Sequence, residues 1–410
     1  MIQLFIFNEI SRAAIYGIGT YIQQLIACLD DEFQINIINY YSDKPEFTIV
    51  ESNKIREFFI PRNQLKYTEG KCDETYFTNS VYLLSDFIDS KDKIIFHFNH
   101  FRYEKTFSLL REYWPTCKII VGIHYFNWCF PLSGNTGYFR EIIQKNPNEL
   151  TETLEKETLA TYRQDVAFLQ SADHIICLAN YAKNLLCSDY QIPEDKISLI
   201  YNGLKDEATF LTSDEKKDFK KKLHIDPNEK IILFVGRLDD IKGIDYLIQA
   251  FKKLLQERND CHLIIIGDGE YSKCLQESKG DWGKILFTGK LPKEEVYQFY
   301  QIADIGIMLS KHEQCSFVAI EMMMHGIPII ASDSTGLDEM VANGVNGYKI
   351  KTIENKNKVF FDTDECCQLL SLALNNNEEE KLRSRCRQQY ETNYSLACMK
   401  EKMQTLYKQI

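Results

Sequence analysis

Short apolar runs alternate with longer polar or amphipathic stretches along most of the chain. In the N-terminal half the apolar runs lie at 2–7, 33–40, 93–98, 118–124, 173–179 and 196–203. Between the first two runs, apolar residues recur at helical spacing from about Tyr16 to Asp30. Continuous apolar strands that alternate with helices predict a parallel sheet with both faces covered.

The same rhythm restarts after a connector that carries proline and charge, at 224–230. Five further apolar runs follow, at 231–236, 262–267, 284–289, 304–309 and 328–332. Most of them end at a glycine or another small residue, as tight strand-to-helix turns require. The pattern therefore predicts an α/β chain of two doubly wound, Rossmann-like domains, at 1–205 and 206–390. A last helix, at 395–409 within the terminal segment 391–410, follows the second domain.

The stretch 135–170 departs from this rhythm, because it is rich in Glu and Thr. Leu150, Leu154, Leu159 and Phe168 recur in it at helical spacing. We expect a long, partly exposed helix added between strands of the first domain. It would serve either as scaffold or as a wall of a binding site.

Composition narrows the class of protein. A chain of 410 residues suits two domains, and its net charge of −11, with both halves acidic, argues against nucleic acid and against an electrostatically driven membrane dock. No apolar run reaches the ~18 residues of a membrane span, and the N-terminal run is too short for a signal peptide. The thirteen cysteines are scattered without a C-x-x-C pair, which favours reduced, buried thiols in a cytoplasmic protein.

Ligands of open parallel sheets bind beyond the carboxyl ends of the strands, and clefts between domains are favoured sites. The stretch GRLDDIKG follows one predicted strand directly. Its Gly236 permits a sharp turn, and Arg237 and Lys242 bring two cations suited to a diphosphate. The alternative is a solvated loop in which Arg237 or Lys242 pairs with Asp239 or Asp240.

The stretch HEQCSFVAIE contains two glutamates, Glu313 and Glu321. The spacing predicts Ser316 as the N-cap of a helix, which places Glu313 in the loop before that helix and Glu321 on its polar side. Two carboxylates can act as the acid and base of a hydrolase, bind sugar hydroxyls or remain surface charges. Hydrolase pairs lie ~5–9.5 Å apart, whereas this spacing would give ~12 Å in a helix, so hydroxyl recognition fits better.

Two further candidates lie in the first half. Gly17 and Gly19 precede a predicted helix, but the third glycine of a dinucleotide fingerprint is Ile22 here, so a simple turn is an equal alternative. His124 ends a predicted strand, where it is either a site residue or a turn histidine. No metal site is expected, because His97 and His100 have neither helical spacing nor an acidic companion.

Taken together, GRLDDIKG, HEQCSFVAIEMMMHGIPIIAS and DSTGLDEMV resemble the signature of retaining GT-B glycosyltransferases of glycosyltransferase family four, the glycosyl transferases group 1. GIGTY, VGIHYF and IYNG match weaker signatures of the first domain, so the resemblance spans most of the chain. It implies that the two domains face each other across a cleft. It also implies that the C-terminal helix crosses back to the first domain.

The resemblance also implies residue roles. Arg237 and Lys242 would hold the diphosphate of a nucleotide sugar, Glu313 the donor sugar and Glu321 the ribose, with His124 near the anomeric carbon. The implied catalytic set is thus Glu313, His124, Arg237 and Lys242. The remaining implied donor-binding positions are Gly17, Gly19, Gly236, Gly267, Gly289, Cys315 and Ser316. Cys315 and Ser316 stand where the family usually has an aromatic residue and a glycine, so the donor-sugar pocket differs there.

The function implied is transfer of a hexose from a nucleotide sugar, with a UDP-sugar favoured, to an acceptor hydroxyl with retention and without metal or other cofactor. The acceptor would be a glycan of a surface polysaccharide, a lipid-linked glycan or, as the alternative, a peptide or protein. The enzyme would be cytoplasmic, with peripheral association at the inner face of the membrane at most. Other classes left open are an epimerase of the same fold and a non-catalytic nucleotide-sugar-binding subunit.

Overall fold

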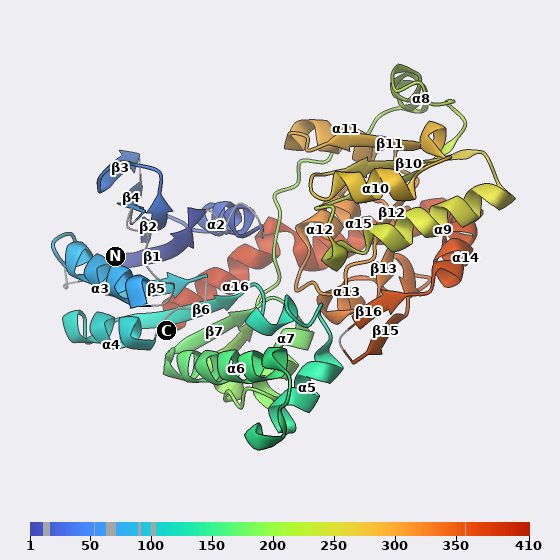
Figure 1. The fold of residues 1–410 in the computed structure, drawn as a ribbon. Helices are drawn as coiled ribbons and strands as arrows, with labels where there is room; N and C mark the ends of the chain where they lie inside the picture. The colour runs from blue at the N-terminus through green and yellow to red at the C-terminus, as the bar shows by residue number, and fades with distance from the viewer. Residues whose placement is uncertain (11–16, 53, 63–70, 89–91, 100–103, 357) are drawn as a thin grey trace. The chain divides into compact units, whose positions relative to one another are not determined.

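The chain folds into two compact units, which are described here from a computed structural model (Figure 1). It describes the whole chain except residues 11–16, 53, 63–70, 89–91, 100–103 and 357. Unit 1 comprises Met1–Phe126, Leu159–Asn202 and Leu396–Ile410. Unit 2 comprises Asn127–Thr158 and Gly203–Ser395.

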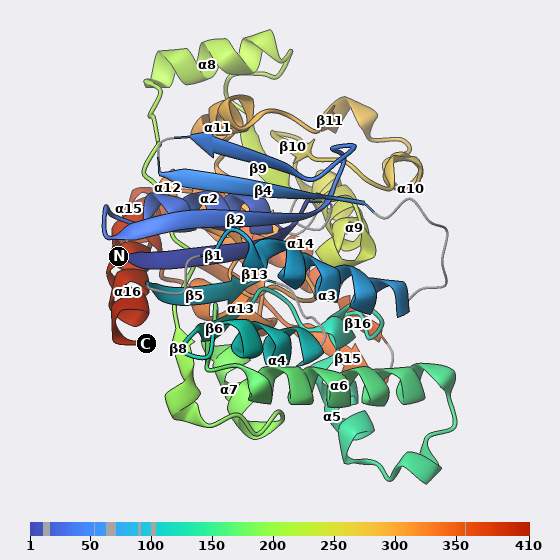
Figure 2. The ribbon, with the colours of Figure 1, turned by 90° about the vertical axis from the view of Figure 1, so that its left-hand side faces the viewer.

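Unit 1 is built on an eight-stranded sheet in the order β3-β4-β2-β1-β5-β6-β7-β8 (Figure 2). All neighbouring strands are parallel except β3 and β4, which pair antiparallel at one edge. The central strands are apolar on both faces, because helices cover both. The strands are β1 (Ile2–Glu9), β2 (Phe33–Ser42), β3 (Thr48–Ser52), β4 (Ile55–Pro61), β5 (Lys93–Phe98), β6 (Lys118–Ile123), β7 (His174–Cys177) and β8 (Ile197–Leu199).

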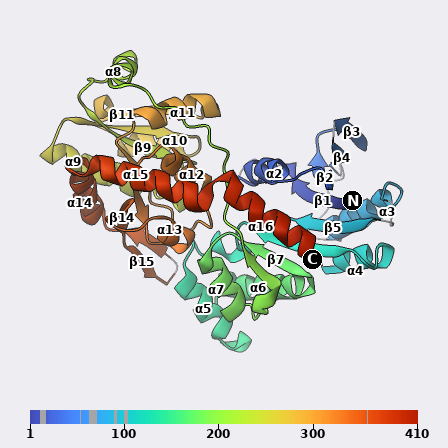
Figure 3. The same cartoon turned by 180° about the vertical axis from the view of Figure 1, so that it is seen from behind.

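The helices of unit 1 are α2 (Ile18–Ala27), α3 (Lys71–Ser85), α4 (Glu104–Tyr113), α7 (Asn180–Ser188) and α16 (Leu396–Gln409), with most of α6 (Thr153–Ser171). Helices α3 and α4 pack on each other (Figure 2). Helix α16 lies beside α2 (Figure 3). Its Tyr407 is fully buried, and the Tyr407 hydroxyl lies 2.6 Å from Nδ1 of His97 in β5. The last helix is thereby part of unit 1.

Unit 2 is built on a six-stranded parallel sheet in the order β11-β10-β9-β12-β13-β14. Its strands are β9 (Lys230–Val235), β10 (Cys261–Ile266), β11 (Ile285–Gly289), β12 (Ile305–Met308), β13 (Ile329–Ser332) and β14 (Gly347–Ile350). A separate antiparallel hairpin joins β15 (Thr352–Asn355) to β16 (Lys358–Phe361). The fold class predicted from the sequence, α/β with two parallel-sheet domains, is confirmed.

The helices of unit 2 cover its sheet, and α9 packs along α14 while α12 packs on α15. Helix α8 begins in a capping box, in which Thr212 accepts from the Glu215 amide and Glu215 accepts from the Thr212 amide. The helices are α5 (Thr136–Gln144), α8 (Ser213–Lys222), α9 (Ile244–Glu257), α10 (Tyr271–Glu277), α11 (Lys293–Ile302), α12 (Phe317–Met324), α13 (Thr335–Met340), α14 (Thr363–Leu374) and α15 (Glu379–Gln389).

The long helix expected in the stretch 135–170 exists as α6, which carries Leu154, Leu159 and Phe168, but it begins only at Thr153. The structure has two helices there, α5 and α6, which are separated by a short 3-10 turn at Pro147–Glu149. Asn146 caps this turn through its side chain, and Pro147 has no amide hydrogen to continue α5. Strands β3, β4 and β14 and the β15–β16 hairpin are absent from the sequence-based prediction. Strands β3, β4 and β15 are exposed or only half-buried over most of their length, and β14 is buried but has only four residues.

The compact units do not follow the sequence-based boundaries of 1–205, 206–390 and 391–410. The segment Asn127–Thr158 comes before β7 and β8 in the chain, yet it groups with unit 2. Leu396–Ile410 groups with unit 1, which confirms the expectation that the C-terminal helix packs back on the first domain. Both segments bury their apolar side chains against residues distant in sequence. A prediction of domain boundaries from the order of elements along the chain cannot detect such contacts.

Candidate functional site

The loop after β9 carries two cations. Gly236 follows the strand directly, and Nη1 of Arg237 lies 3.0 Å from Oδ2 of Asp239. The carboxylate of Asp239 also accepts a hydrogen bond of 3.2 Å from the Lys242 amide, so it closes the loop locally. The ion pair weighed as an alternative therefore exists between Arg237 and Asp239. It does not exclude anion binding, because the guanidinium has five N–H donors and its side chain remains 39% exposed.

Gly243 shows why this loop has its shape. Its φ is 64°, and a Cβ built on it would lie 2.3 Å from the carbonyl oxygen of Leu309 at the end of β12. Only glycine fits so close to another backbone. The β9 loop is thus packed directly on the backbone that leads to Glu313.

Lys242 and Glu313 form an ion pair between the two loops, in which Nζ of Lys242 donates to Oε1 of Glu313. Both side chains are largely buried, and Ser310 Oγ donates a further hydrogen bond of 3.3 Å to the same oxygen. The structure therefore brings together two residues that were predicted as site residues from separate stretches of the sequence. A cation and a carboxylate side by side suit a ligand that carries both phosphate and hydroxyl groups.

Helix α12 follows Glu313. Ser316 is its N-cap, as predicted, and its side chain accepts a hydrogen bond of 3.4 Å from the Ala319 amide. Cys315 is buried beside it. Glu321 lies in the second turn of α12, and its Oε2 accepts a hydrogen bond of 2.9 Å from the hydroxyl of Tyr300 in α11.

The surroundings of Glu321 favour its neutral form. Burial raises the pKa of the Glu321 carboxyl to about 7, although the hydrogen bond from Tyr300 lowers it in part. Glu321 lies on the half-buried side of α12, together with Phe317 and Val318, while the other residues of the helix are buried. A carboxyl with a pKa near neutrality is typical of functional sites.

Gly267 and Gly289 lie after neighbouring strands of the same sheet. The Gly267 amide donates a hydrogen bond of 3.0 Å to the Gly289 carbonyl, and the Gly236 amide donates one of 2.9 Å to the Ile266 carbonyl. A Cβ on Gly267 would lie only 1.7 Å from the Gly236 carbonyl oxygen. The loops after β9, β10 and β11 are therefore in direct backbone contact at the carboxyl edge of the sheet.

The candidates from the first half of the chain lie in unit 1. Gly17 has a φ of 71° and is the N-cap of α2, while Gly19 is the second residue of that helix. Residues 11–16 of the same predicted loop lie outside the described residues. His124 follows β6, as expected, and its ring contacts Tyr21 of α2 edge-on with 4.5 Å between centroids.

Asn99 determines which ring nitrogen of His124 carries a proton. Nδ2 of Asn99 donates a hydrogen bond of 3.2 Å to the Phe7 carbonyl, so Oδ1 is its acceptor atom. This oxygen lies 2.9 Å from Nε2 of His124, which must therefore be the donor. In the neutral ring the lone pair then resides on Nδ1. A Cβ on Gly122 would be tight against Nε2 of His97, at 3.0 Å, and would only touch Asn99 Oδ1 and His124 Nε2, at 3.4 and 3.5 Å.

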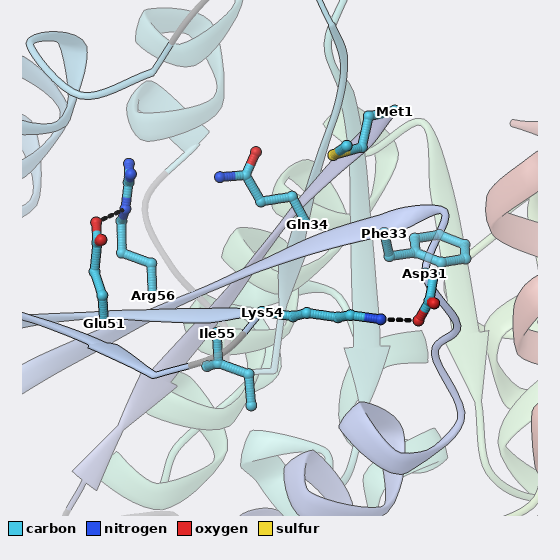
Figure 4. A pocket seen from close by; sticks show the side chains of 8 residues that line it. All are labelled: Met1, Asp31, Phe33, Gln34, Glu51, Lys54, Ile55 and Arg56. Atoms are coloured by element: carbon cyan, nitrogen blue, oxygen red, sulfur yellow. Dashed lines mark hydrogen bonds and ion pairs between the residues drawn. The ribbon is translucent and has the colours of Figure 1, made fainter.

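A pocket of about 270 Å³ lies at the amino ends of β2 and β4, and Met1, Phe33, Lys54 and Ile55 are among its lining residues (Figure 4). Its charges are paired, Lys54 with Asp31 and Arg56 with Glu51 (Figure 4). It lies at the opposite end of the strands from His124. This pocket is therefore not the candidate site.

Within the described part of the chain, no three His, Cys, Asp or Glu side chains are grouped so that they could hold a metal ion. Among the same residues, no helix combines the length and the apolar character needed to span a membrane.

Sequence reasoning missed Tyr300 and Asn99 as residues of the candidate site. Tyr300 and Asn99 act through hydrogen bonds to residues 21 and 25 positions away, and neither belongs to a quoted motif. No local signal could have identified them, because their partners are set by strand order and helix packing.

Comparison with known proteins agrees with this geometry. Residues 215–359 match the family described as "Glycosyl transferases group 1", and residues 15–208 match "Glycosyltransferase Family 4". The two matches together span most of the chain.

Among similar proteins are an uncharacterized glycosyltransferase of Methanocaldococcus jannaschii and the lipopolysaccharide 1,2-N-acetylglucosaminetransferase of Salmonella typhimurium. The first is 35% identical over 178 residues, which are 42% of this chain and 45% of that protein. The second is 30% identical over 172 residues, which are 39% of this chain and 44% of that protein. The chain thus spans less than half the length of these relatives.

Solved structures share the fold. The Anabaena protein Alr3699/HepE, in complex with UDP-glucose, superposes with a TM-score of 0.70 over the full length of both chains at 13% identity. The two parallel-sheet units thus have the GT-B arrangement of elements, and the loops after β9 and β12 carry the expected charged residues. With both halves matched by their respective family profiles, the chain belongs to the group 1 glycosyltransferases.

Proposed function

We propose that this chain is a retaining hexosyltransferase that takes its sugar from a nucleoside diphosphate sugar, with a UDP-sugar as donor. The observation that carries the proposal is the pairing of Lys242 with Glu313 at the carboxyl edge of the unit 2 sheet. A phosphate-binding cation and a hydroxyl-binding carboxylate in contact suit the two halves of a nucleotide sugar, which meet at the diphosphate.

The donor would lie along this edge. Arg237 and Lys242 hold the diphosphate, Glu321 accepts the ribose hydroxyls and Glu313 accepts hydroxyls of the sugar. Gly236, Gly267 and Gly289 allow backbone to approach the nucleotide, and Cys315 and Ser316 line the phosphate side at the start of α12. The Anabaena structure supports UDP as the nucleotide, because that protein was solved with UDP-glucose.

The chemistry needs electrostatic stabilisation more than a strong base. In a retaining transfer, the leaving diphosphate takes the proton of the acceptor hydroxyl on the same face of the sugar. Negative charge grows on the diphosphate as the glycosidic bond breaks, and Arg237 and Lys242 stabilise it. For Gly17, Gly19 and His124 of unit 1 we keep the role that the resemblance implies, near the donor phosphate and sugar. No metal is required in this scheme, since the two side-chain cations take its place.

The acceptor is proposed to be a hydroxyl of a glycan, either of a surface polysaccharide or attached to a lipid, with a peptide as the alternative. The similarity to a lipopolysaccharide transferase supports the first of these. We place the enzyme in the cytoplasm, with peripheral contact to the inner face of a membrane at most. Nucleic acid is not proposed as a partner, because the net charge of −11 opposes it.

Calorimetric titration with UDP, GDP, ADP and their common sugar conjugates tests the donor assignment, with Mg²⁺ and with EDTA. We expect binding of UDP and a UDP-sugar that is equal in both buffers. Binding of no nucleotide would overturn the proposal, and binding only with Mg²⁺ would overturn its metal-independent form. Proton NMR of the product then tests retention, because the anomeric coupling of the transferred sugar must match that of the donor.

A further inference from the structure

The loop Ser310–Glu313 lies between β12 and α12 and carries the carboxylate assigned to the donor sugar. It is held on one side by residues at the end of β13 and directly after it. Ser332 and Ser334 both donate hydrogen bonds of 2.6 Å to the Ser310 carbonyl. Thr335 Oγ1 accepts from the Glu313 amide at 2.9 Å and donates to the Glu313 carbonyl at 2.5 Å. The backbone of Glu313 is therefore fixed at both its polar groups.

A second side of the loop is held by the turn that carries Lys242. The Lys311 amide donates a hydrogen bond of 2.8 Å to the Ile241 carbonyl. The Lys311 side chain, which is only 5% exposed, donates one of 2.6 Å to Oδ2 of Asp240. The turn that carries Lys242 and the loop Ser310–Glu313 are thus joined by a backbone hydrogen bond and by a side-chain ion pair.

The third side is covered by Asn127–Thr158, the segment that precedes β7 in the chain. A Cβ on Gly134 would lie 2.7 Å from the Lys311 carbonyl oxygen and 2.9 Å from the His312 Cβ. The ring of Trp128 meets the ring of His312 edge-on at 5.7 Å and stacks on Phe139 at 4.3 Å. Burial lowers the pKa of His312 to about 4, so this contact involves a neutral imidazole at physiological pH.

The same segment is anchored a second time, on the β15–β16 hairpin of unit 2, beside which α5 lies in both views (Figures 1 and 2). Nδ2 of Asn135 donates a hydrogen bond of 3.2 Å to the Lys356 carbonyl. The Gly137 amide donates one of 3.2 Å to Glu354, and Lys356 pairs with Glu152 at 2.9 Å. Asn135 is 1% exposed and also caps α5, so the two anchors are rigidly connected.

We propose that Asn127–Thr158 belongs to the donor-sugar site: by packing on Lys311 and His312 it positions the Glu313 carboxylate, and so governs affinity for the sugar more strongly than affinity for the nucleotide. Its residues are positioning residues, because they act through Glu313. The inference rests on the proposed function. It assigns a task in sugar recognition to a segment that the order of the chain places among the elements of unit 1.

Gly134→Ala is the test, with Gly344→Ala as matched control. Both glycines have a positive φ, 78° and 72°, so both substitutions strain the backbone equally. Only the Cβ at position 134 meets other atoms, since nothing lies within 4 Å of the Cβ at position 344. Affinities for UDP and for the UDP-sugar that the wild type binds are measured by calorimetry on each full-length protein.

We expect Gly134→Ala to weaken UDP-sugar binding about tenfold or more and UDP binding several-fold less, because its Cβ meets Lys311 and His312 next to Glu313, whereas the turn of Lys242 is reached only through Lys311. Gly344→Ala should leave both affinities unchanged. An equal loss for UDP and UDP-sugar, or no loss for either, would overturn the inference. If the wild type binds neither ligand, the proposed function fails instead.

Trp128→Phe is the second variant, in case Gly134→Ala does not fold. It shortens the ring that meets His312 and retains an aromatic partner for Phe139. The expected result is the same selective loss of UDP-sugar affinity, of smaller size. Unchanged selectivity in a folded Trp128→Phe protein would contradict the inference independently.

Discussion

The hydroxyl of Tyr300 donates a hydrogen bond of 2.9 Å to Oε2 of Glu321. This contact joins α11 to α12, and Tyr300 is fully buried. Burial raises the pKa of Glu321 to about 7, and the Tyr300 hydroxyl counteracts part of that rise because it stabilises the carboxylate. The Tyr300 hydroxyl thus helps to keep the pKa of Glu321, the group proposed to bind ribose, near neutral pH.

The first prediction concerns the pH dependence of donor binding. Ribose hydroxyls donate to the ionised carboxylate, whereas the free protein protonates Glu321 below its pKa of about 7. The affinity for a UDP-sugar should therefore fall as the pH drops below 7, by up to about tenfold per unit, and level off above it. Calorimetry between pH 5 and 8.5 measures this, and a UDP-sugar is chosen because its diphosphate does not titrate in that range.

Two variants assign that pH dependence to its cause. Glu321→Gln should bind more weakly at neutral pH and lose the pH dependence. Tyr300→Phe should raise the pKa of Glu321, because it removes the hydrogen bond that favours the carboxylate, and so move the midpoint to higher pH. A midpoint that stays in place in both variants would assign the titration to another group.

The second prediction concerns the ion pair of Lys242 and Glu313. Lys242→Ala and Glu313→Gln should each lower transfer by about 10²-fold or more, as the loss of a preorganised electrostatic contact typically does. Lys242→Ala should also weaken UDP binding, whereas Glu313→Gln should leave it nearly intact, since UDP has no sugar for Glu313 to bind. Steady-state kinetics and calorimetry measure the two effects. Near-normal activity in both variants would contradict the site assignment.

The third prediction concerns the tautomer of His124. In the wild type, Nε2 should carry the proton of the neutral ring, because Oδ1 of Asn99 accepts from it at 2.9 Å. Asn99→Leu removes that acceptor and should yield a mixture of tautomers. Transfer should fall about fivefold, in line with roughly 1 kcal/mol for one hydrogen bond. Nitrogen-15 NMR of the imidazole gives the tautomer directly, and a protonated Nδ1 in the wild type would contradict the assignment.

The fourth prediction concerns the attachment of the C-terminal helix. Tyr407→Phe should lower the stability of unit 1 by about 1–3 kcal/mol, because it leaves Nδ1 of the buried His97 without its partner. Burial lowers the pKa of His97 to about 3, so the imidazole cannot compensate by taking a proton near neutral pH. Thermal unfolding measures the loss.

Lys408→Gln is the control for that experiment. Lys408 pairs with Glu32 at 2.7 Å on the same helix, but its side chain is 40% exposed. Such a pair contributes about 0–1 kcal/mol, so the melting temperature should barely change. An equal loss of stability in both variants would indicate that the His97–Tyr407 contact stabilises unit 1 no more than the exposed Lys408–Glu32 pair does.

The sequence by itself determined the fold class and much of the candidate site. Buried strands in parallel sheets are continuous apolar runs, and the turns after them carry glycine and charge, so both signals are local and readable. The runs at 2–7, 93–98 and 262–267 became β1, β5 and β10, and Ser316 caps α12 as its position indicated. Lys242 and Glu313 could be predicted as site residues from separate motifs, because each lies in a loop after a predicted strand.

Only the tertiary structure decided which of these residues meet. The pairing of Lys242 with Glu313, the hydrogen bond from Tyr300 to Glu321 and the grouping of Asn127–Thr158 with unit 2 all join positions far apart in the chain. Such contacts depend on strand order and on which helix faces which neighbour. Periodicity reports which face of an element is buried but carries no information about what it is buried against.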